Sequence, residues 1–152
     1  MNTLLYRCLT LGLAALASFA VASPKTEVLL EHYGDALQEQ NAEALSSLFA
    51  PDAEVRLLLE QPGAEPLAIT LTEDEHLQQL RALWRFSEEA TYSLSDVTHS
   101  AGADVHRVQF TQTERYRLFG QTLHRDGRVR MRVRVTPGGL LITGIEALIS
   151  ER

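Results

Sequence analysis

The chain has 152 residues, of which 45% are hydrophobic and 22% charged, with a formal net charge of −6 and a single Cys. This length suits one domain, and the composition excludes both a disordered chain and a multi-span membrane protein. The acidic balance excludes a generally basic nucleic-acid binder, so we expect no nucleic-acid partner. One Cys also excludes an internal disulfide and a Cys-based zinc site.

The first 22 residues have the pattern of an export signal. After Arg7, residues 9–22 form an unbroken run of apolar and small residues that ends in Ala20-Val21-Ala22, the small-x-small pattern of a signal peptidase site. The run is shorter than the roughly 20 residues that span a bilayer. We therefore expect a signal peptide over 1–22, cleavage before Ser23, and a single periplasmic or secreted domain over 23–152 without membrane contact. An uncleaved membrane anchor is the alternative.

Charge is unevenly distributed over the expected mature chain. Residues 23–104 hold four basic and sixteen acidic side chains, whereas residues 105–152 hold nine arginines and four acidic side chains. Such asymmetry is typical of internal neutralisation, of self-association or of an anion site.

Helices and two strands are predicted in the first half of the chain. Apolar residues at helical spacing predict a helix over 25–40 and a shorter one over 42–49, which Pro51-Asp52 ends. Alternation predicts strands around residues 55–59 and 67–71. Thr72, followed three residues later by Glu75, has the sequence of a capping box and predicts a third helix that ends near Phe86. His76, beside three acids in the first turn of that helix, is interpreted as a solvated side chain.

The second half of the chain predicts strands. They cover about 91–99, 104–117, 128–136 and 140–149, with turns at Asp126-Gly127 and 137–139. Over 128–136, apolar residues alternate with arginines. Because successive side chains of a strand point to opposite faces, one face of the sheet should be apolar and the other rich in arginine. The four arginines of this pattern are Arg128, Arg130, Arg132 and Arg134.

The order of the elements resembles a known superfamily. The segments Tyr33-Gly34-Asp35-Ala36-Leu37, Asn41-Ala42-Glu43-Ala44-Leu45 and Leu48-Phe49-Ala50-Pro51-Asp52-Ala53-Glu54-Val55 are similar to the opening of nuclear transport factor 2-like proteins, which include ketosteroid isomerases and SnoaL-like proteins. The resemblance implies an α+β fold in which N-terminal helices pack on a strongly curved, mostly antiparallel sheet. That superfamily includes enzymes, binding proteins and assembly modules, so the fold alone does not fix the function.

The resemblance also allows a test for isomerase chemistry. A ketosteroid isomerase-like site uses a Tyr on the first helix, an Asp base on the first strand and a protonated Asp on a later strand. Tyr33 falls at the first position, but Leu57 falls at the second and Met131 or Arg132 at the third. Since none of these three is a carboxylic acid, the resemblance argues against that chemistry.

Glu114 is the strongest catalytic candidate that remains. Together with His106 and Gln112, it is expected to point to the apolar face of the sheet, because these residues are an even number of positions apart on one strand. Burial there would raise its pKa and suit it to acid/base catalysis with Tyr33 or His106. The alternative is a carboxylate at the rim that pairs with an arginine such as Arg117 or Arg132.

Metal and cofactor sites are not indicated. The five histidines, His32, His76, His99, His106 and His124, include no pair at the spacing of metal ligands. We therefore expect neither a metal nor a cofactor.

Two classes of function stay open. The favoured one is a non-catalytic domain that binds a small apolar or amphipathic ligand or another protein and forms a homodimer through the sheet. The second is an enzyme of isomerase, dehydratase or hydrolase type that uses Glu114 with Tyr33 or His106. The residues expected to line the pocket are Tyr33, Leu57, Trp84, Tyr92, Phe110, Glu114 and Met131. Those expected at the interface are Arg107, Arg115, Arg130, Arg132 and Arg134.

Overall fold

A computed structural model describes residues 24–152; the predicted signal peptide and its cleavage point lie outside this range. No helix within the range is long and apolar enough to cross a membrane. Helices and strands follow in the order α1 (Pro24–Gln38), α2 (Ala42–Ser46), β1 (Phe49–Gln61), β2 (Ala64–Thr72), α3 (Glu73–Phe86), β3 (Ser87–Ala101), β4 (Val105–Leu118), β5 (Gln121–Thr136) and β6 (Gly139–Glu151).

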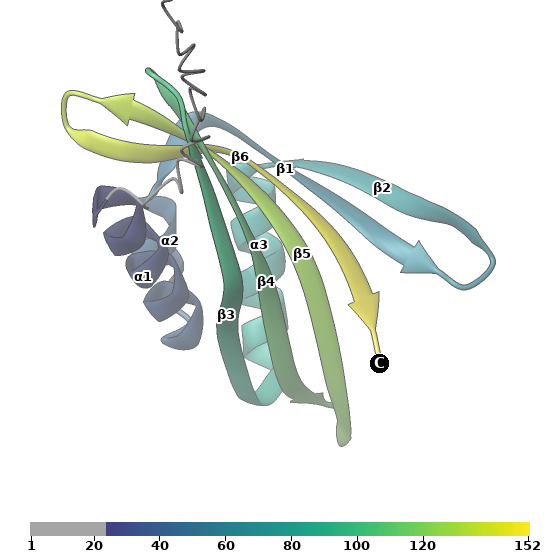
Figure 1. Cartoon of the computed structure of the whole chain (residues 1–152). Coiled ribbons are helices and arrows are strands. Elements are labelled where there is room, and N and C mark those ends of the chain that lie inside the picture. The colour runs from purple at the N-terminus through teal and green to yellow at the C-terminus, as the bar shows by residue number, and fades with distance from the viewer. Residues whose placement is uncertain (1–23) are drawn as a thin grey trace, which may run out of the picture.

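The strands form one sheet in the order β2-β1-β6-β5-β4-β3. All neighbouring strands run antiparallel except β1 and β6, which run parallel. The strands bend, and the helices lie on one side of the sheet, with the β1–β2 hairpin reaching away from α1 and α2 (Figure 1). The predicted class, helices packed on a curved and mostly antiparallel sheet, is confirmed.

Side-chain caps fix where α2 and α3 begin. The Asn41 side chain accepts a hydrogen bond from the Ala44 amide at 3.0 Å. Thr72 and Glu75 form the predicted capping box: the Glu75 amide donates to the Thr72 hydroxyl at 3.3 Å, and the Thr72 amide donates to the Glu75 carboxylate at 2.8 Å. These bonds satisfy amides that have no partner inside the helix, and they fix the first residue of each helix.

The turn predicted at Asp126-Gly127 is wrong. β5 runs straight through both residues, and the hairpin between β4 and β5 turns at Phe119-Gly120, since Leu118 pairs with Gln121. Both turn residues have positive φ, 50° and 81°. Asp-Gly is a strong hairpin signal, whereas Phe-Gly is not. Here the Asp126 carboxylate accepts a hydrogen bond from Thr113 on the paired strand at 3.1 Å.

The predicted end of the second helix also differs. α2 stops at Ser46, and Phe49 already pairs with Ile142 of β6 as the first residue of β1. The pairing register is irregular between Phe49 and Glu54. Pro51 lies in that irregular stretch, where its missing amide hydrogen removes no regular ladder bond.

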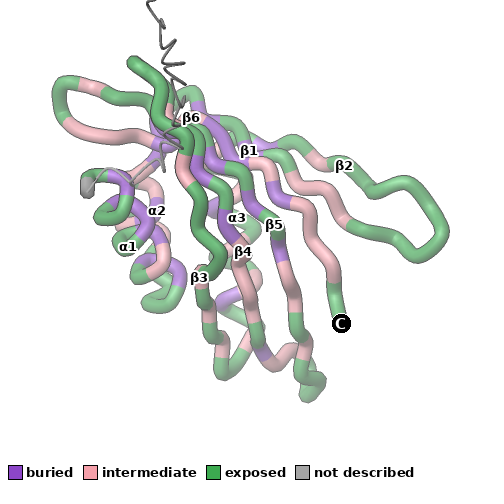
Figure 2. Tube along the Cα trace, viewed as in Figure 1, coloured by how far each residue is buried: buried purple, intermediate pink, exposed green. Residues whose placement is uncertain are grey.

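The sheet has two contrasting faces. On β5, Val129, Met131 and Val133 are at most 4% exposed and face the helices, whereas the arginines between them are exposed. Figure 2 shows this alternation along β5. We call the helix side the covered face. The other side is the open face, which carries Arg56, Arg107, Arg128, Arg130, Arg132 and Arg134. The predicted division into an apolar and an arginine-rich face is confirmed.

Candidate functional site

A cavity of about 260 Å³ lies between the covered face and α3. Most of its wall is hydrocarbon, and a few polar side chains interrupt it, as in sites for small molecules. The lining residues are Tyr33, Leu37, Val55, Leu57, His76, Gln79, Leu80, Leu83, Gln112, Glu114, Arg125, Gly127, Val129, Ile145, Ala147 and Ile149.

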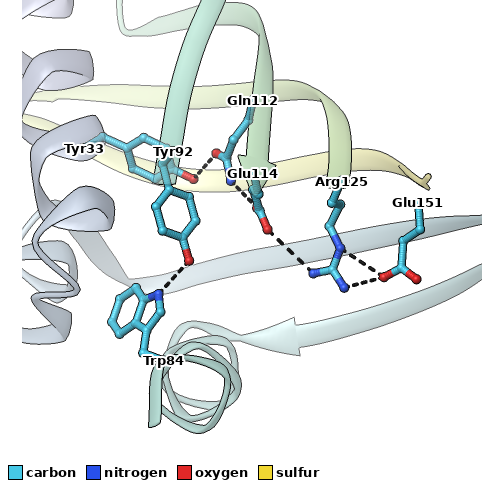
Figure 3. Close-up of polar contacts among 7 residues, drawn as sticks. All are labelled: Tyr33, Trp84, Tyr92, Gln112, Glu114, Arg125 and Glu151. Atoms are coloured by element: carbon cyan, nitrogen blue, oxygen red, sulfur yellow. Dashed lines mark hydrogen bonds and ion pairs between the residues drawn. The ribbon is translucent and has the colours of Figure 1, made fainter. Parts of the chain in front are cut away.

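Three of the polar residues form a hydrogen-bonded chain (Figure 3). The Tyr33 hydroxyl donates to Gln112 Oε1 at 3.2 Å, and Gln112 Nε2 donates to Glu114 Oε1 at 2.7 Å. Gln112 and Glu114 point to the covered face because they continue the two-residue period of buried Val108 and Phe110 along β4. The chain therefore links α1 to the sheet across the cavity wall.

Arg125 on β5 extends this chain toward solvent. Its Nη1 lies 3.7 Å from Glu114 Oε2, and its Nη2 lies 2.5 Å from Glu151 Oε1. The guanidinium also lies over the Tyr116 ring, 5.6 Å from the centroid. Sequence reasoning missed Arg125 because it placed a turn at residues 126–127. The sequence does contain a signal for it. In a continuous strand, Arg125 points to the same face as Gly127 and Val129, because the three residues are spaced two apart.

Burial shifts the pKa values of two residues in this hydrogen-bonded chain, Glu114 and Tyr33. It raises the pKa of the Glu114 carboxyl above its usual range, while the bond from Gln112 and the charge of Arg125 oppose that shift. Burial also raises the pKa of Tyr33 well above its ordinary value, and the nearby Glu114 charge adds to the effect. Tyr33 therefore keeps its proton at neutral pH and acts through hydrogen bonds.

The expected pocket residues divide into two groups. Tyr33, Leu57 and Glu114 line the cavity. The others lie in or beside the core: Phe110 packs edge to face on Tyr33 with centroids 6.0 Å apart, Met131 is 1% exposed, and the Trp84 indole donates to the Tyr92 hydroxyl at 2.7 Å. Burial raises the pKa of Tyr92 to about 12.

His76 is not the solvated side chain that the sequence suggested. It lines the cavity from α3, and burial lowers its pKa to about 4, so the imidazole is neutral at pH 7. Its Nδ1 is buried without a hydrogen-bond partner among residues 24–152. The other candidate, His106, is outside the cavity lining, with its Nδ1 3.3 Å from the Thr26 hydroxyl.

The expected interface arginines all lie on strands of the sheet, outside the cavity. Glu146 is shared by Arg130 at 3.6 Å and Arg56 at 3.4 Å, and Arg134 pairs with Asp52 at 3.1 Å. Within the described range, no ion pair forms at Arg107, Arg115 or Arg132.

Arg132 has a special place on the open face. Its guanidinium lies next to Gly144, where an added Cβ would collide with it. Arg132 and Arg107, which pair across β4 and β5, line an open-face hollow of about 270 Å³. Neither Arg117, which pairs with Glu88 and Glu89, nor Arg132 is the partner of Glu114.

No metal site is evident in the described residues. Across residues 24–152, no three His, Cys, Asp or Glu side chains converge as metal ligands would. The polar part of the cavity is instead one carboxylate, two amides, one phenol, one imidazole and one guanidinium, a set that can bind and orient a ligand or exchange a proton with it.

No protein-family model and no curated protein matches the chain. Solved structures do match. A proposed scytalone dehydratase from Novosphingobium aromaticivorans has a TM-score of 0.66 and 17% identity, over 81% of this chain and 80% of that one. A nuclear transport factor 2-like protein with a cystatin-like fold from the same organism has a TM-score of 0.62 and 20% identity, over 82% and 79%.

A third structure gives the same result. A proposed dehydratase of the nuclear transport factor 2-like family from Streptomyces avermitilis has a TM-score of 0.62 and 21% identity, over 82% of this chain and 93% of that one. At such identities the likeness concerns the fold and not the reaction. Together with the sheet order and the helix-covered face, it shows that this chain has the nuclear transport factor 2-like fold.

Proposed function

We propose that the chain is an exported, non-catalytic domain that binds a small apolar or amphipathic ligand in the cavity under the sheet. The observation that carries the proposal is the cavity itself, about 260 Å³ with hydrocarbon walls and one buried polar chain of Tyr33, Gln112 and Glu114. Apolar walls provide affinity, and a few fixed polar atoms provide orientation.

The state of the polar groups supports binding over catalysis. Glu114 accepts from Gln112 and lies beside Arg125, and the Tyr33 hydroxyl already donates to Gln112. Leu57, at the position that the resemblance gives to a general base, contributes only hydrocarbon to the cavity. These groups hold one another in place, which suits a rigid recognition surface.

Native mass spectrometry of protein purified from its own compartment tests the proposal. We expect a mass that begins at Ser23, with a small-molecule adduct. A matched pair of variants locates the adduct. Gly127→Val adds a side chain inside the cavity, where its Cβ meets no atom closer than 3.8 Å, and Arg128→Val changes the next residue on the open face. The adduct should be lost only in Gly127→Val; its survival there, or its absence in the unmodified protein, would contradict the proposal.

A second candidate is an enzyme of isomerase, dehydratase or hydrolase type with Glu114 as acid/base. Burial raises the pKa of this carboxyl, as acid/base catalysis at neutral pH requires. Of its two possible partners, Tyr33 is joined to it through Gln112, whereas His106 is bonded to Thr26. Incubation of the recovered ligand with the protein tests this candidate: an isomer or a dehydrated or hydrolysed product that Glu114→Gln abolishes would establish catalysis.

For the partner, we propose a second copy of the chain bound through the open face. Arg107, Arg132 and Glu54 line one hollow there and have no ion pair within residues 24–152, so a two-fold axis can bring Glu54 of each copy to an arginine of the other. Arginine is also favoured at interfaces. Sedimentation equilibrium should give a dimer that Arg132→Glu dissociates; a monomer at micromolar concentration would contradict this.

A further inference from the structure

The hollow on the open face carries an excess of positive charge. Its charged lining residues are Arg56, Arg107, Arg130, Arg132, Glu54 and Glu146, four arginines against two glutamates, with a formal charge of +2. Glu146 is already shared by Arg56 at 3.4 Å and Arg130 at 3.6 Å. Arg107 and Arg132, by contrast, form no ion pair within residues 24–152.

The sheet register places these two arginines directly opposite each other. Arg107 on β4 pairs with Arg132 on β5, and two like charges at such positions are destabilising unless a counter-charge offsets them. On the other side of Arg132 comes Gly144 of β6, and Glu54 of β1 is paired with Gly144. With strands about 4.8 Å apart, the backbone of Glu54 lies about 10 Å from that of Arg132 and about 14 Å from that of Arg107. The carboxylate and the paired arginines thus occupy opposite ends of the hollow.

We infer that Arg107 and Arg132 bind a dianionic phosphoryl group, either inorganic phosphate or a phosphate monoester. A guanidinium can donate two parallel hydrogen bonds to phosphate oxygens, and a charge of −2 offsets the formal charge of the hollow. The side-chain amide of Gln109, which also lines the hollow, provides a further donor two residues from Arg107. Gly144 has no side chain, so the Arg132 guanidinium lies close to the backbone of β6.

This site is separate from the cavity on the covered face and has a different ligand. It does use the arginines to which the proposed dimer brings Glu54 of a second copy. A phosphoryl group bound there takes the place of that carboxylate, so phosphate and the second copy compete for the open face. This consequence, unlike the site itself, rests on the proposed function.

Phenyl phosphate and phenyl sulfate test the site, because they have similar shapes but different charges, near −2 and −1 above about pH 7. Each is titrated into the ¹⁵N-labelled Glu54→Gln variant at pH 7.5, in which the competing carboxylate is gone. The side-chain Nε–H signals of Arg107 and Arg132 report binding. We expect a dissociation constant about tenfold lower for the phosphate ester. Equal constants, or signals that do not move, would overturn the inference and leave the cavity ligand and the dimer standing.

Inorganic phosphate, titrated in the same way, distinguishes the two sources of the phosphoryl group. A dissociation constant equal to that of phenyl phosphate would identify the free ion as sufficient. A constant several-fold higher would identify a phosphate monoester, whose organic part adds contacts in the hollow.

Two arginine variants locate the site. Arg107→Gln and Arg128→Gln, each made in the Glu54→Gln background, remove one positive charge from the open face, but Arg128 is not in the lining of the hollow. Arg107→Gln should weaken phenyl phosphate binding about tenfold, and Arg128→Gln by less than about twofold, because salt screens distant charges. Thermal unfolding checks that both variants are folded. Equal losses would show general attraction to a basic surface and would overturn the site.

The competition has its own measurement. Sedimentation equilibrium of the unmodified protein in phosphate and in sodium chloride of equal ionic strength should give a weaker dimer in phosphate. A dimer of equal strength in both salts would overturn the competition, while the titrations still decide the site. A monomer in both salts, with the arginine signals still moving, would overturn the dimer and support the phosphoryl site.

Discussion

The covered and open faces of the sheet are built from the same strands but differ in how many charged side chains they carry and in how these are paired. The covered face holds few charged groups, Glu114 and Arg125 among them, with side chains 12% and 25% exposed and joined to each other. The open face holds many charged groups, such as Arg130 at 72% exposed, and several have no ion pair within the described range. Charged side chains are therefore few and paired where water is excluded, and many and loosely paired where water screens them.

Truncation of two neighbouring residues on β5 should give the largest difference in stability between the two faces. Met131→Ala opens space in the core and should lower the free energy of unfolding by about 2–5 kcal/mol. Arg130→Ala, one residue away on the open face, should change it by less than about 0.5 kcal/mol. Urea denaturation measures both, and comparable losses would remove the distinction between the faces.

The pH dependence of stability should reveal His76 on the covered side. Its pKa falls from 6.5 to about 4 on folding, so between these values the unfolded chain binds more protons than the folded one. Stability should therefore fall as the pH drops from about 6.5 to about 4, by up to about 3 kcal/mol. His76→Leu should remove this part of the dependence in thermal unfolding at several pH values. His124→Gln, at an exposed site of β5, should not, and a slope that survives in His76→Leu would refute the assignment.

Arg125→Ala should have an intermediate effect. It leaves the Glu114 carboxylate buried beside no cation, and we expect a loss of about 1–3 kcal/mol at pH 7. Adding Glu114→Gln should recover most of that loss, because the charge without a partner is then gone. Denaturant unfolding of the two single variants and the double variant measures the coupling, and additive losses would show that the pair is not coupled.

The smallest effect should come from Gly144 and Arg132. Gly144→Ala meets only the far end of the Arg132 side chain, which can lift into solvent, so the expected loss is below about 1 kcal/mol. In an Arg132→Ala background the same change should be neutral or slightly stabilising, since alanine has less freedom to lose than glycine. Thermal unfolding measures this, and a large loss in that background would mean that the strand itself needs glycine.

Much of the fold was predictable from the sequence because it depends on local patterns. Alternation on β5 predicts the two faces, and Thr72 with Glu75 predicts the start of α3. The site was predictable where a residue belonged to an unbroken pattern, as for Tyr33 and Glu114, which line the cavity.

The features that the sequence did not predict depend on which strands and helices pack together in the folded chain. Asp126-Gly127 favours a turn locally, but pairing with Gln112 and Thr113 of β4 and with β6 holds it extended, and this places Arg125 beside Glu114. The burial of His76 likewise comes from the way α3 packs under the sheet. The acidic residues beside it in the sequence indicate a solvated side chain instead. No local pattern records which strand will lie next to which.

The position of β6 has a consequence for how the chain folds. This strand, formed last along the chain, lies between β1 and β5, and it pairs Ala147 with Leu57 across 90 residues of sequence. Until residues 139–151 arrive, the β1–β2 hairpin and the β3–β5 meander are two half-sheets with no ladder between them. Such distant pairing slows folding. During that delay the open edges of β1 and β5 are the places where two nascent copies would join wrongly.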